Sequence, residues 1–440
     1  MSIIKQLGNQ KASLFLLILA FGLIMQGSIA VAETKTPDEP TDILSAPIWD
    51  SAQNLTSNVY GSRLAVARGA PNGSTVIVGY VRQMSDVESN TDVYYRRSTN
   101  NGAPGSWSNE ARIHSSSGIR STELDIDYDN ANKAHAIWVE NGLQLHYAAE
   151  ASWSSNISSI RSTSDTGIAG PRIVASGTSN IDVIWAEYNN FQWQIFHSRS
   201  RNGGSSWVVA KNLVSIGSTD FSTRPALAVN GNTIHVVWEE GIISAKIQYA
   251  RGTVNTSTNE VTWTTPRTIS AASAATNGKQ PQIVLSGNTL HVSYTERLAT
   301  QQQYIHHIQC SSSCANANVN TYWQSTGNPV SGQVLGVYAS NPFDVISTIG
   351  QLGGCTLVYF HGLLSSGENE QIWGTSSCGK WAASAKDEVT GNSTRAIFPN
   401  LETQNNWWLY LVYEEFVSEN VRQVRFIRNE PALYLPIVVK

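Results

Sequence analysis

Charged side chains recur at one position of a pattern that repeats along the chain. Seven apolar runs end in an aromatic residue, and two positions later stand Arg82, Glu140, Glu187, Glu240, Glu296, His361 and Glu415. Near the start of the companion runs stand Arg63, Arg172, Arg224 and Arg395. Guanidinium and carboxylate groups form charge-assisted hydrogen bonds with each other or with a polar ligand. The pattern therefore predicts a band of ionic side chains with a structural or a ligand-binding role.

Hydrogen bonds between neighbouring units would explain the repeated glutamates, since a residue present in five of seven units marks a scaffold rather than one reaction centre. The departures from the pattern, Arg82 and His361, are more informative. So are three irregular insertions, residues 83–91, 298–302 and 363–369. Because loops carry function more often than the strands they connect, we expect a ligand site near these insertions.

Several familiar catalytic and metal-binding patterns are missing from the sequence. There is no nucleophile elbow (G-x-S-x-G), no zinc-protease motif (H-E-x-x-H) and no phosphate-binding loop. Residues 125–130 resemble the start of a calcium-binding loop, but the glycine and the distal glutamate are absent, which favours a strand followed by an acidic turn. We therefore expect no metal and no cofactor.

The spacing of the tryptophans indicates how the chain positions these residues. They recur at intervals of 46 to 60 residues, at Trp49, Trp107, Trp153, Trp207, Trp263, Trp323 and Trp381. Between them lie short β-branched runs such as residues 181–185, 234–238 and 290–294, each preceded and followed by another strand-like run. With the tryptophan segment as the fourth strand, the repeat predicts an all-β fold, a β-propeller of seven four-stranded blades.

Two alternatives stay open: six blades with an accessory hairpin, and a pair of packed β-sheets. The chain ends favour a closed ring. The last unit has no tryptophan strand of its own, whereas a lone tryptophan strand at residues 47–50 precedes the first unit. We therefore expect the N-terminal strand to complete the C-terminal blade, which removes a free sheet edge.

The antiparallel strand order assigns the ionic residues to one face of the ring. The start of the first strand and the end of the second strand of each blade lie at the same rim. We therefore expect one shallow pocket at the ring centre, with Arg82 as a further candidate ligand-binding residue and the turn at Asn202 and Trp207 on the opposite face. The residues expected to converge in this pocket are Arg63, Arg224, Arg395, Glu240, Glu415 and His361.

The turn before the fourth strand carries a motif in two repeats. Residues 200–207 (SRNGGSSW) resemble the Asp-box, S-x-D-x-G-x-T-W, with Asn202 in place of the aspartate and Ser206 in place of the threonine. Residues 98–107 show the same pattern with two additional residues. On these motifs, residues 47–430 resemble the sialidase-like superfamily of β-propellers. The resemblance implies a ligand site around the axis, whereas the motif itself is a folding device and does not report catalysis.

The resemblance also implies what a catalytic site would contain. Sialidases hold the substrate carboxylate with three arginines, use a tyrosine activated by a glutamate as nucleophile, and use an aspartate as acid/base. The matching candidates are Arg63, Arg224 and Arg395 for the arginines, Tyr413 with Glu414 or Glu415 for the nucleophile pair, and Asp92 or Asp86 for the aspartate. Only Thr223-Arg224-Pro225 approaches the family's Phe-Arg-Ile-Pro motif, and it lies in mid-chain. Because most of the set is absent, catalytic activity is the less favoured interpretation.

The N-terminal segment has the features of a secretory signal peptide. Lys5 and Lys11 form a basic start, residues 14–25 are apolar but too short to span a bilayer, and residues 30–32 (AVA) are small. We expect cleavage after Ala32, a flexible leader at residues 33–46, the propeller at residues 47–430 and a C-terminal tail at residues 431–440. The mature protein is then secreted, without a membrane-spanning segment.

The four cysteines lie in two adjacent repeats, at Cys310, Cys314, Cys355 and Cys378. Their spacing does not fit a zinc ribbon, and no histidine pair at zinc-ligand spacing accompanies them. Export permits disulfides, and the expected hairpin brings Cys355 within reach of Cys378. We predict the pairs Cys310–Cys314 and Cys355–Cys378.

Composition narrows the range of partners. Charged residues make up 14% of the chain, the formal net charge is −4, and there is no basic stripe, which argues against nucleic acid. We expect a monomer that recognises a glycan or an extracellular protein on its axial face. An exo-acting glycosidase of the sialidase type and a purely structural extracellular propeller are the alternatives.

Overall fold

The computed structural model describes residues 49–57, 59–87, 89–115, 119–155, 157–164, 167–213, 221–273, 277–297, 302–326, 330–335, 347–362, 369–377, 387–391, 394–404 and 408–429. They belong to one compact unit, Leu44–Lys440. The predicted signal peptide, the leader and the C-terminal tail lie outside the described residues, as do Trp381 and Cys378. These domain boundaries and the Cys355–Cys378 pair therefore stay predictions.

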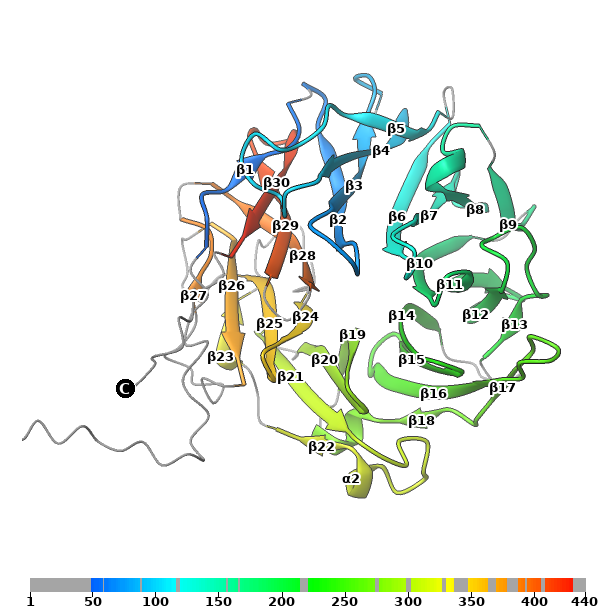
Figure 1. Cartoon of the computed structure of the whole chain (residues 1–440). Coiled ribbons are helices and arrows are strands. Elements are labelled where there is room, and N and C mark those ends of the chain that lie inside the picture. Colours follow the sequence, from blue (N-terminus) through cyan, green and yellow to red (C-terminus); the bar gives the residue numbers. More distant parts are fainter. Residues whose placement is uncertain are drawn as a thin grey trace, which may run out of the picture. The chain divides into compact units, whose positions relative to one another are not determined.

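Seven four-stranded antiparallel sheets follow one another around a ring (Figure 1). The first four blades are β2–β5 (Ser62–Gly69, Val76–Gln83, Thr91–Ser98, Ala111–His114), β6–β9 (Ser121–Tyr128, Ala134–Glu140, Gln144–Ala149, Ser158–Ser162), β10–β13 (Ile168–Ser176, Asn180–Asn189, Gln192–Ser200, Lys211–Asn212) and β14–β17 (Ser222–Asn230, Thr233–Glu240, Lys246–Val254, Val261–Trp263). The other three are β19–β22 (Gly278–Ser286, Thr289–Arg297, Gln302–Cys310, Gln324–Ser325), β24–β27 (Ser347–Leu352, Cys355–Gly362, Gln371–Ser376, Asp387–Glu388) and β28–β30 with β1 (Ala396–Gln404, Trp408–Phe416, Arg422–Arg428, Gln53–Asn54). The seven-bladed propeller predicted from the tryptophan spacing is confirmed, and neither alternative architecture is present.

Short additions accompany these blades. Strands β18 (Arg267–Thr268) and β23 (Val330–Leu335) pair with the third strands of their sheets, β16 and β21. The described helical residues are one short helix, α2 (Val319–Tyr322), and the 3-10 turns Glu150–Ser152 and Ser270–Ser273. No helix in the described part of the chain is long and apolar enough to cross a membrane.

The ring closes through the N-terminal strand, as expected. Strand β1 pairs with β30, with Gln53 opposite Phe426, and Trp49 forms an isolated bridge with Asn429. Leu55 extends the pairing by a backbone hydrogen bond of 2.9 Å to Val424. The first described residues and the last thus share one sheet.

Second strands are buried along most of their length because neighbouring blades cover both faces of each sheet. Every residue of β7 and of β25 is buried. The apolar side chains of adjacent blades form shared clusters, and one such cluster joins Val81 and Val93 of one blade to Ile126 and Trp138 of the next. The core of the molecule therefore lies between the blades.

Six tryptophans of the repeated series lie in the described residues, and each packs edge-on against an aromatic ring of the preceding blade. The ring centroids lie 4.5 to 5.5 Å apart and the planes cross at 68 to 84°. The pairs are Trp49–Tyr359, Trp107–Phe426, Trp153–Tyr95, Trp207–Tyr147, Trp263–His197 and Trp323–Tyr249. This edge-to-face geometry is the favoured one for aromatic rings, so the sequence period corresponds to a repeated joint between blades.

The turn at residues 200–207 holds one of these tryptophans in place. The Ser200 hydroxyl accepts hydrogen bonds from the backbone N–H groups of Asn202 (3.3 Å) and Gly204 (2.9 Å). The Asn202 side-chain oxygen accepts from the Ser206 N–H at 2.9 Å. Gly204, at φ +85°, leaves space that the Tyr147 ring of the preceding blade fills. Short polar side chains and a glycine thus shape the turn that receives the neighbouring ring.

The Cys310–Cys314 disulfide is present, with Cα atoms 5.8 Å apart, which confirms this predicted pair. The bond follows directly after β21, and the helix α2 comes shortly afterwards. The Trp323 indole donates a hydrogen bond of 2.9 Å to the Cys314 carbonyl. The disulfide loop is therefore tied to one of the aromatic joints.

The two adjacent glycines of the 200–207 turn provide a matched test of this joint. Gly203 also has positive φ (+66°), but a Cβ there would meet nothing within 4 Å. We expect Gly203→Ala to cost about 1–2 kcal/mol of unfolding free energy through backbone strain alone. Gly204→Ala, whose Cβ would overlap the Tyr147 ring, should cost about 3–5 kcal/mol. Equal losses in denaturant unfolding would contradict the role assigned to the joint.

Candidate functional site

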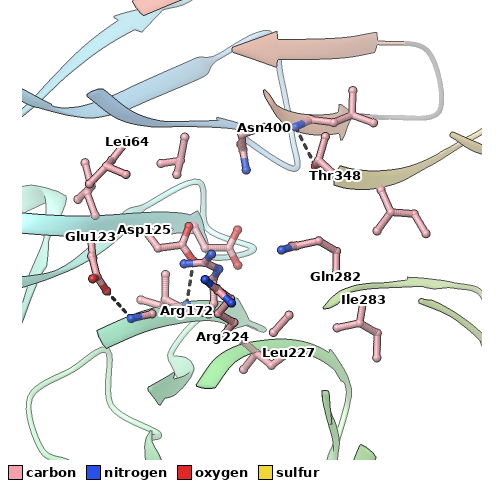
Figure 2. A pocket seen from close by; sticks show the side chains of 18 of the residues that line it. Leu64, Glu123, Asp125, Arg172, Arg224, Leu227, Gln282, Ile283, Thr348 and Asn400 are labelled. Carbon is pink, nitrogen blue, oxygen red and sulfur yellow. Dashed lines mark hydrogen bonds between the residues drawn. The ribbon is translucent and has the colours of Figure 1, made fainter. Parts of the chain in front are cut away.

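A cavity of about 710 Å³ lies on the propeller axis. Its wall comes from the first strands of all seven blades, β2, β6, β10, β14, β19, β24 and β28, which lie nearest the ring centre in Figure 1. Figure 2 shows side chains from these strands facing one another across the cavity. A site at this position draws on every blade at once.

A repeated bulge sets how the first strands present their side chains. In six blades the pairing between the first and second strand shifts by one position near its start. The bulge residues, all with φ between +51° and +59°, are Leu64, Glu123, Gly170, Arg224, Gln280 and Phe398. Such a bulge redirects the residues that follow it, and here alternate residues after it face the axis.

The polar side chains of the wall can be sorted by their distance along the strand from the bulge residue. The first level lies two positions after the bulge and, with Thr348 of β24, consists of Asp125, Arg172, Gln282, Thr348 and Asn400. The second level lies four positions after the bulge and consists of Arg68, Asp127 and Glu402. Val66 and Ala226 complete the first level and Val174 and Val284 contribute to the second. Ionic and amide side chains therefore share the wall with small apolar ones.

Several of these polar groups connect neighbouring blades. Asp125 accepts a hydrogen bond from the Ile173 N–H at 3.0 Å, and Asp127 accepts one from the Ala175 N–H at 2.8 Å. Between the last and the first blade, the Asn400 side-chain oxygen accepts from the Ala67 N–H at 3.0 Å. These bonds satisfy backbone donors that the first strand, as the innermost, would otherwise leave without partners.

One arginine lies among three carboxyl groups in the deeper level. The Arg68 guanidinium is 3.1 Å from Asp125 and 4.0 Å from Asp127, and Glu402 also interacts with its charge. Burial raises the pKa of the Asp127 carboxyl to about 6 and that of Glu402 to about 7, although the charge of Arg68 opposes both shifts. This part of the wall changes its charge between pH 5 and pH 8.

Two further arginines, on the neighbouring strands β10 and β14, face the cavity (Figure 2). Arg224 forms an ion pair of 2.9 Å with Glu239, and its side chain is 47% exposed. Arg172 donates to the carbonyl of Pro171 at 2.9 Å and forms no ion pair with any described residue. Its remaining N–H groups can therefore bind an anionic or carbonyl oxygen in the cavity.

The structure brings one member of the predicted pocket, Arg224, into this cavity, and Arg63, Arg395, Glu240, Glu415 and His361 are not among the residues that line it. Arg395 pairs with Glu370 and lies over the Phe416 ring. His361 is fully buried, 3.7 Å from Glu370. These three residues form a cluster between two blades.

The glutamates that follow the second-strand aromatics also contact their own and adjacent blades. Glu240 accepts a hydrogen bond of 3.1 Å from Gln248, and Glu415 pairs with Arg425. Glu187 pairs with Arg161 of the preceding blade at 2.6 Å. Although burial raises the pKa of Glu140, hydrogen bonds from His114 and His146 lower it to about 2. These contacts show that the glutamates stabilise the strands within and between blades.

The weaker catalytic candidates lie outside the cavity wall as well. The Tyr413 side chain is buried, and its burial raises the pKa of the phenol. Asp92 is buried 3.4 Å from Arg112, and Arg82 pairs with Glu110 at 2.7 Å. Of the three insertions, residues 298–301 and 363–368 lie outside the described residues, so their role stays a prediction.

Sequence reasoning missed most of the polar wall, including Arg68, Asp127 and Glu402. The available signal was the alternation of polar residues within otherwise apolar first strands, as in Asp125-Ile126-Asp127 and Asn400-Leu401-Glu402. Residues 125–130 were predicted to be a strand and an acidic turn, and β6 confirms the strand. Among the described residues, no group of three or more His, Cys, Asp or Glu side chains could hold a metal ion.

Comparison with known proteins finds similarity only at the level of solved structures. No family model matches the sequence, and no curated protein matches it. A Trypanosoma rangeli sialidase in complex with sialic acid is 10% identical with a TM-score of 0.44, over 84% of this chain and 54% of that one. A protein of unknown function from Dyadobacter fermentans is 10% identical with a TM-score of 0.49, over 87% and 98%. A leech intramolecular trans-sialidase is 10% identical with a TM-score of 0.42, over 87% and 70%.

The chain spans about half the length of the Trypanosoma sialidases that it matches. At these identities the likeness concerns the fold alone.

The carboxyl groups of the deeper level predict a pH dependence. A carboxyl whose pKa is raised on folding binds more protons in the folded state, so its contribution to stability falls as the pH rises from about 4.5 to about 7. Glu402→Gln removes this loss and should raise the melting temperature by about 2 °C or more at pH 8, and by less at pH 5. The exposed Glu419→Gln is the control. An equal effect of Glu402→Gln at both pH values would contradict the raised pKa.

Proposed function

We propose that the protein is a secreted recognition module that binds a sugar with an anionic group in its axial cavity. The observation that carries the proposal is Arg172, a guanidinium that faces the cavity without an ion-pair partner among the described residues. A cation held in a concave, partly apolar site is suited to a ligand carboxylate or sulfate.

The rest of the wall supports a carbohydrate. Gln282, Thr348 and Asn400 present amide and hydroxyl groups toward the cavity from three different strands (Figure 2). These groups can both donate and accept hydrogen bonds, as sugar hydroxyls do. A volume of about 710 Å³ falls within the range of small-molecule sites and would hold one or two sugar rings.

Recognition without catalysis is the better supported activity. The three candidate arginines do not share the cavity, since only Arg224 lines it. Tyr413 is buried in the cluster that also holds Leu401, and no tyrosine belongs to the described wall. The nucleophile and carboxylate clamp of a sialidase are therefore not assembled by the candidates in the described part of the chain.

One observation favours a glycosidase as the second candidate. Asp127 and Glu402 lie in the same cavity with raised pKa values, and a carboxyl of this kind can donate a proton near neutral pH. Asp125, 3.1 Å from Arg68, would be the second carboxyl group. Glycoside hydrolases usually act with a pair of carboxyl groups.

Export fits the described disulfide, because such bonds persist in oxidising compartments. The predicted signal peptide at residues 1–32 would direct the export of the protein. Detection of the mature N-terminus at Glu33 in the culture medium would support this part of the proposal, and retention of residues 1–32 would contradict it.

Titration calorimetry with N-acetylneuraminic acid, glucuronic acid and neutral glucose tests the binding proposal. An acidic sugar should bind, and Arg172→Ala should weaken its binding about tenfold or more because a charged hydrogen bond is lost. Affinity should also fall with rising salt, and from pH 5 to pH 8 by about 3- to 10-fold as Asp127 and Glu402 become charged.

Arg201→Ala, an exposed arginine in the turn at residues 200–207, is the matched control and should bind as the wild type does. Glucose binding as tight as that of the acidic sugars would refute the role of Arg172. Hydrolysis of fluorogenic glycosides that Glu402→Gln abolishes would instead establish the second candidate.

A further inference from the structure

The hairpin between β11 and β12 has an unusual composition. Residues 188–193 read Tyr-Asn-Asn-Phe-Gln-Trp: three aromatic residues and three amides, with no charged and no aliphatic side chain. The hairpin closes through the pair Asn189 and Gln192, and the register is regular along its whole length. The six side chains are thus held on a rigid support.

The tip of this hairpin carries an aromatic ring in an unfavourable position. Asn190 and Phe191 form a two-residue turn with φ of +50° and +64°. Turns of this kind favour glycine at the second position, because a bulky side chain at positive φ is strained. Phe191 nevertheless occupies it and is 86% exposed. The ring contributes little to the core, so its position at a strained turn points to an external contact.

Behind the tip, a second aromatic pair lies across the two strands. Tyr188 and Trp193 are directly opposite each other, with ring centroids 5.7 Å apart at 58°. Gly167 approaches the Trp193 ring closely, which fixes the indole at its place. Both side chains are only half-buried, so parts of both rings remain accessible.

The amide side chains of the hairpin are available for hydrogen bonds with a ligand. The side chains of Asn189, Asn190 and Gln192 make no hydrogen bond within the described residues, in contrast to Asn202 and Asn400, whose amides are both bonded. Amides beside exposed aromatic rings match the two properties of a neutral sugar chain: hydroxyl groups at the edge and C–H groups on the faces. None of these six side chains carries a charge.

The hairpin also lies on the same face of the ring as the start of β10, whose later residues line the cavity. Ile168, at the start of β10, is opposite Glu187, and the Tyr188 N–H donates to the Gly167 carbonyl at 2.8 Å. The bulge at Gly170 follows two residues later on the same strand. The tip therefore extends from the face on which the axial cavity opens.

We infer that residues 188–193 form a second binding site, for a neutral polysaccharide chain, with Phe191 as its stacking platform. This site is independent of the proposed cavity function, since it uses no charged group. It would hold a long glycan at the face of the ring while the cavity remains free for a terminal group.

Affinity electrophoresis in native gels containing hydroxyethylcellulose, laminarin, galactomannan or xyloglucan tests the site. At least one of these polymers should retard the wild-type protein, and high salt should leave the retardation unchanged because no charge takes part. Phe191→Gly should weaken binding about tenfold, the loss of one stacking contact. Gln192→Ala should weaken it less.

The same variant separates binding from folding. Glycine adopts positive φ freely, so Phe191→Gly should keep or raise the melting temperature while binding is lost. Val209→Ala, at an equally exposed apolar residue outside the hairpin, should bind as the wild type does. Failure of all four polymers to retard the protein, or unchanged retardation of Phe191→Gly, would overturn the inference. Release by excess N-acetylneuraminic acid would place the binding in the cavity and overturn it as well.

Discussion

The edge-to-face contact between a tryptophan of one blade and an aromatic ring of the blade before it is the interaction on which the rest of the structure depends. A four-stranded sheet with two apolar faces cannot stand alone in water, so each blade is stable only between its neighbours. The repeated joint fixes the distance and angle of that packing six times in the described residues. Turn glycines such as Gly204 are required because the incoming ring occupies the space of a side chain.

The axial cavity is a product of the same packing. The packing of the blades brings seven first strands to one centre, where each is the edge strand of its own sheet and its axis-facing backbone groups have no further strand to pair with. Asp125, Asp127 and Asn400 satisfy part of this need by accepting N–H groups from the next blade. The polar side chains of the wall are therefore needed first to bond the backbone of the closed ring. A ligand can bind the groups that are not used in this way, such as the guanidinium of Arg172.

Much of the fold could be predicted from the sequence because its period is carried by a few large residues. Trp49 and Asn429 lie far apart in sequence, yet the matched chain ends were sufficient to place them in one sheet. The site could be predicted less well. Arg224 lines the cavity, whereas Arg63 directly precedes the bulge residue Leu64, Arg395 directly precedes β28, and neither of these two lines the cavity. A shift of one residue turns a side chain to the other face of a strand, and the bulge that causes it leaves no clear mark in a single sequence.

The closure by β1 has a mechanical consequence. Strand β1 runs antiparallel to β30, and Trp49 lies opposite Asn429. The chain therefore enters β1 and leaves β30 at the same end of this strand pair. A force that pulls the ends apart would open this pair one hydrogen bond at a time, like a zip, instead of shearing all of them together. The aromatic contacts between blades thus stabilise the ring against heat, whereas the β1–β30 pair is the place where a pulling force would open it first.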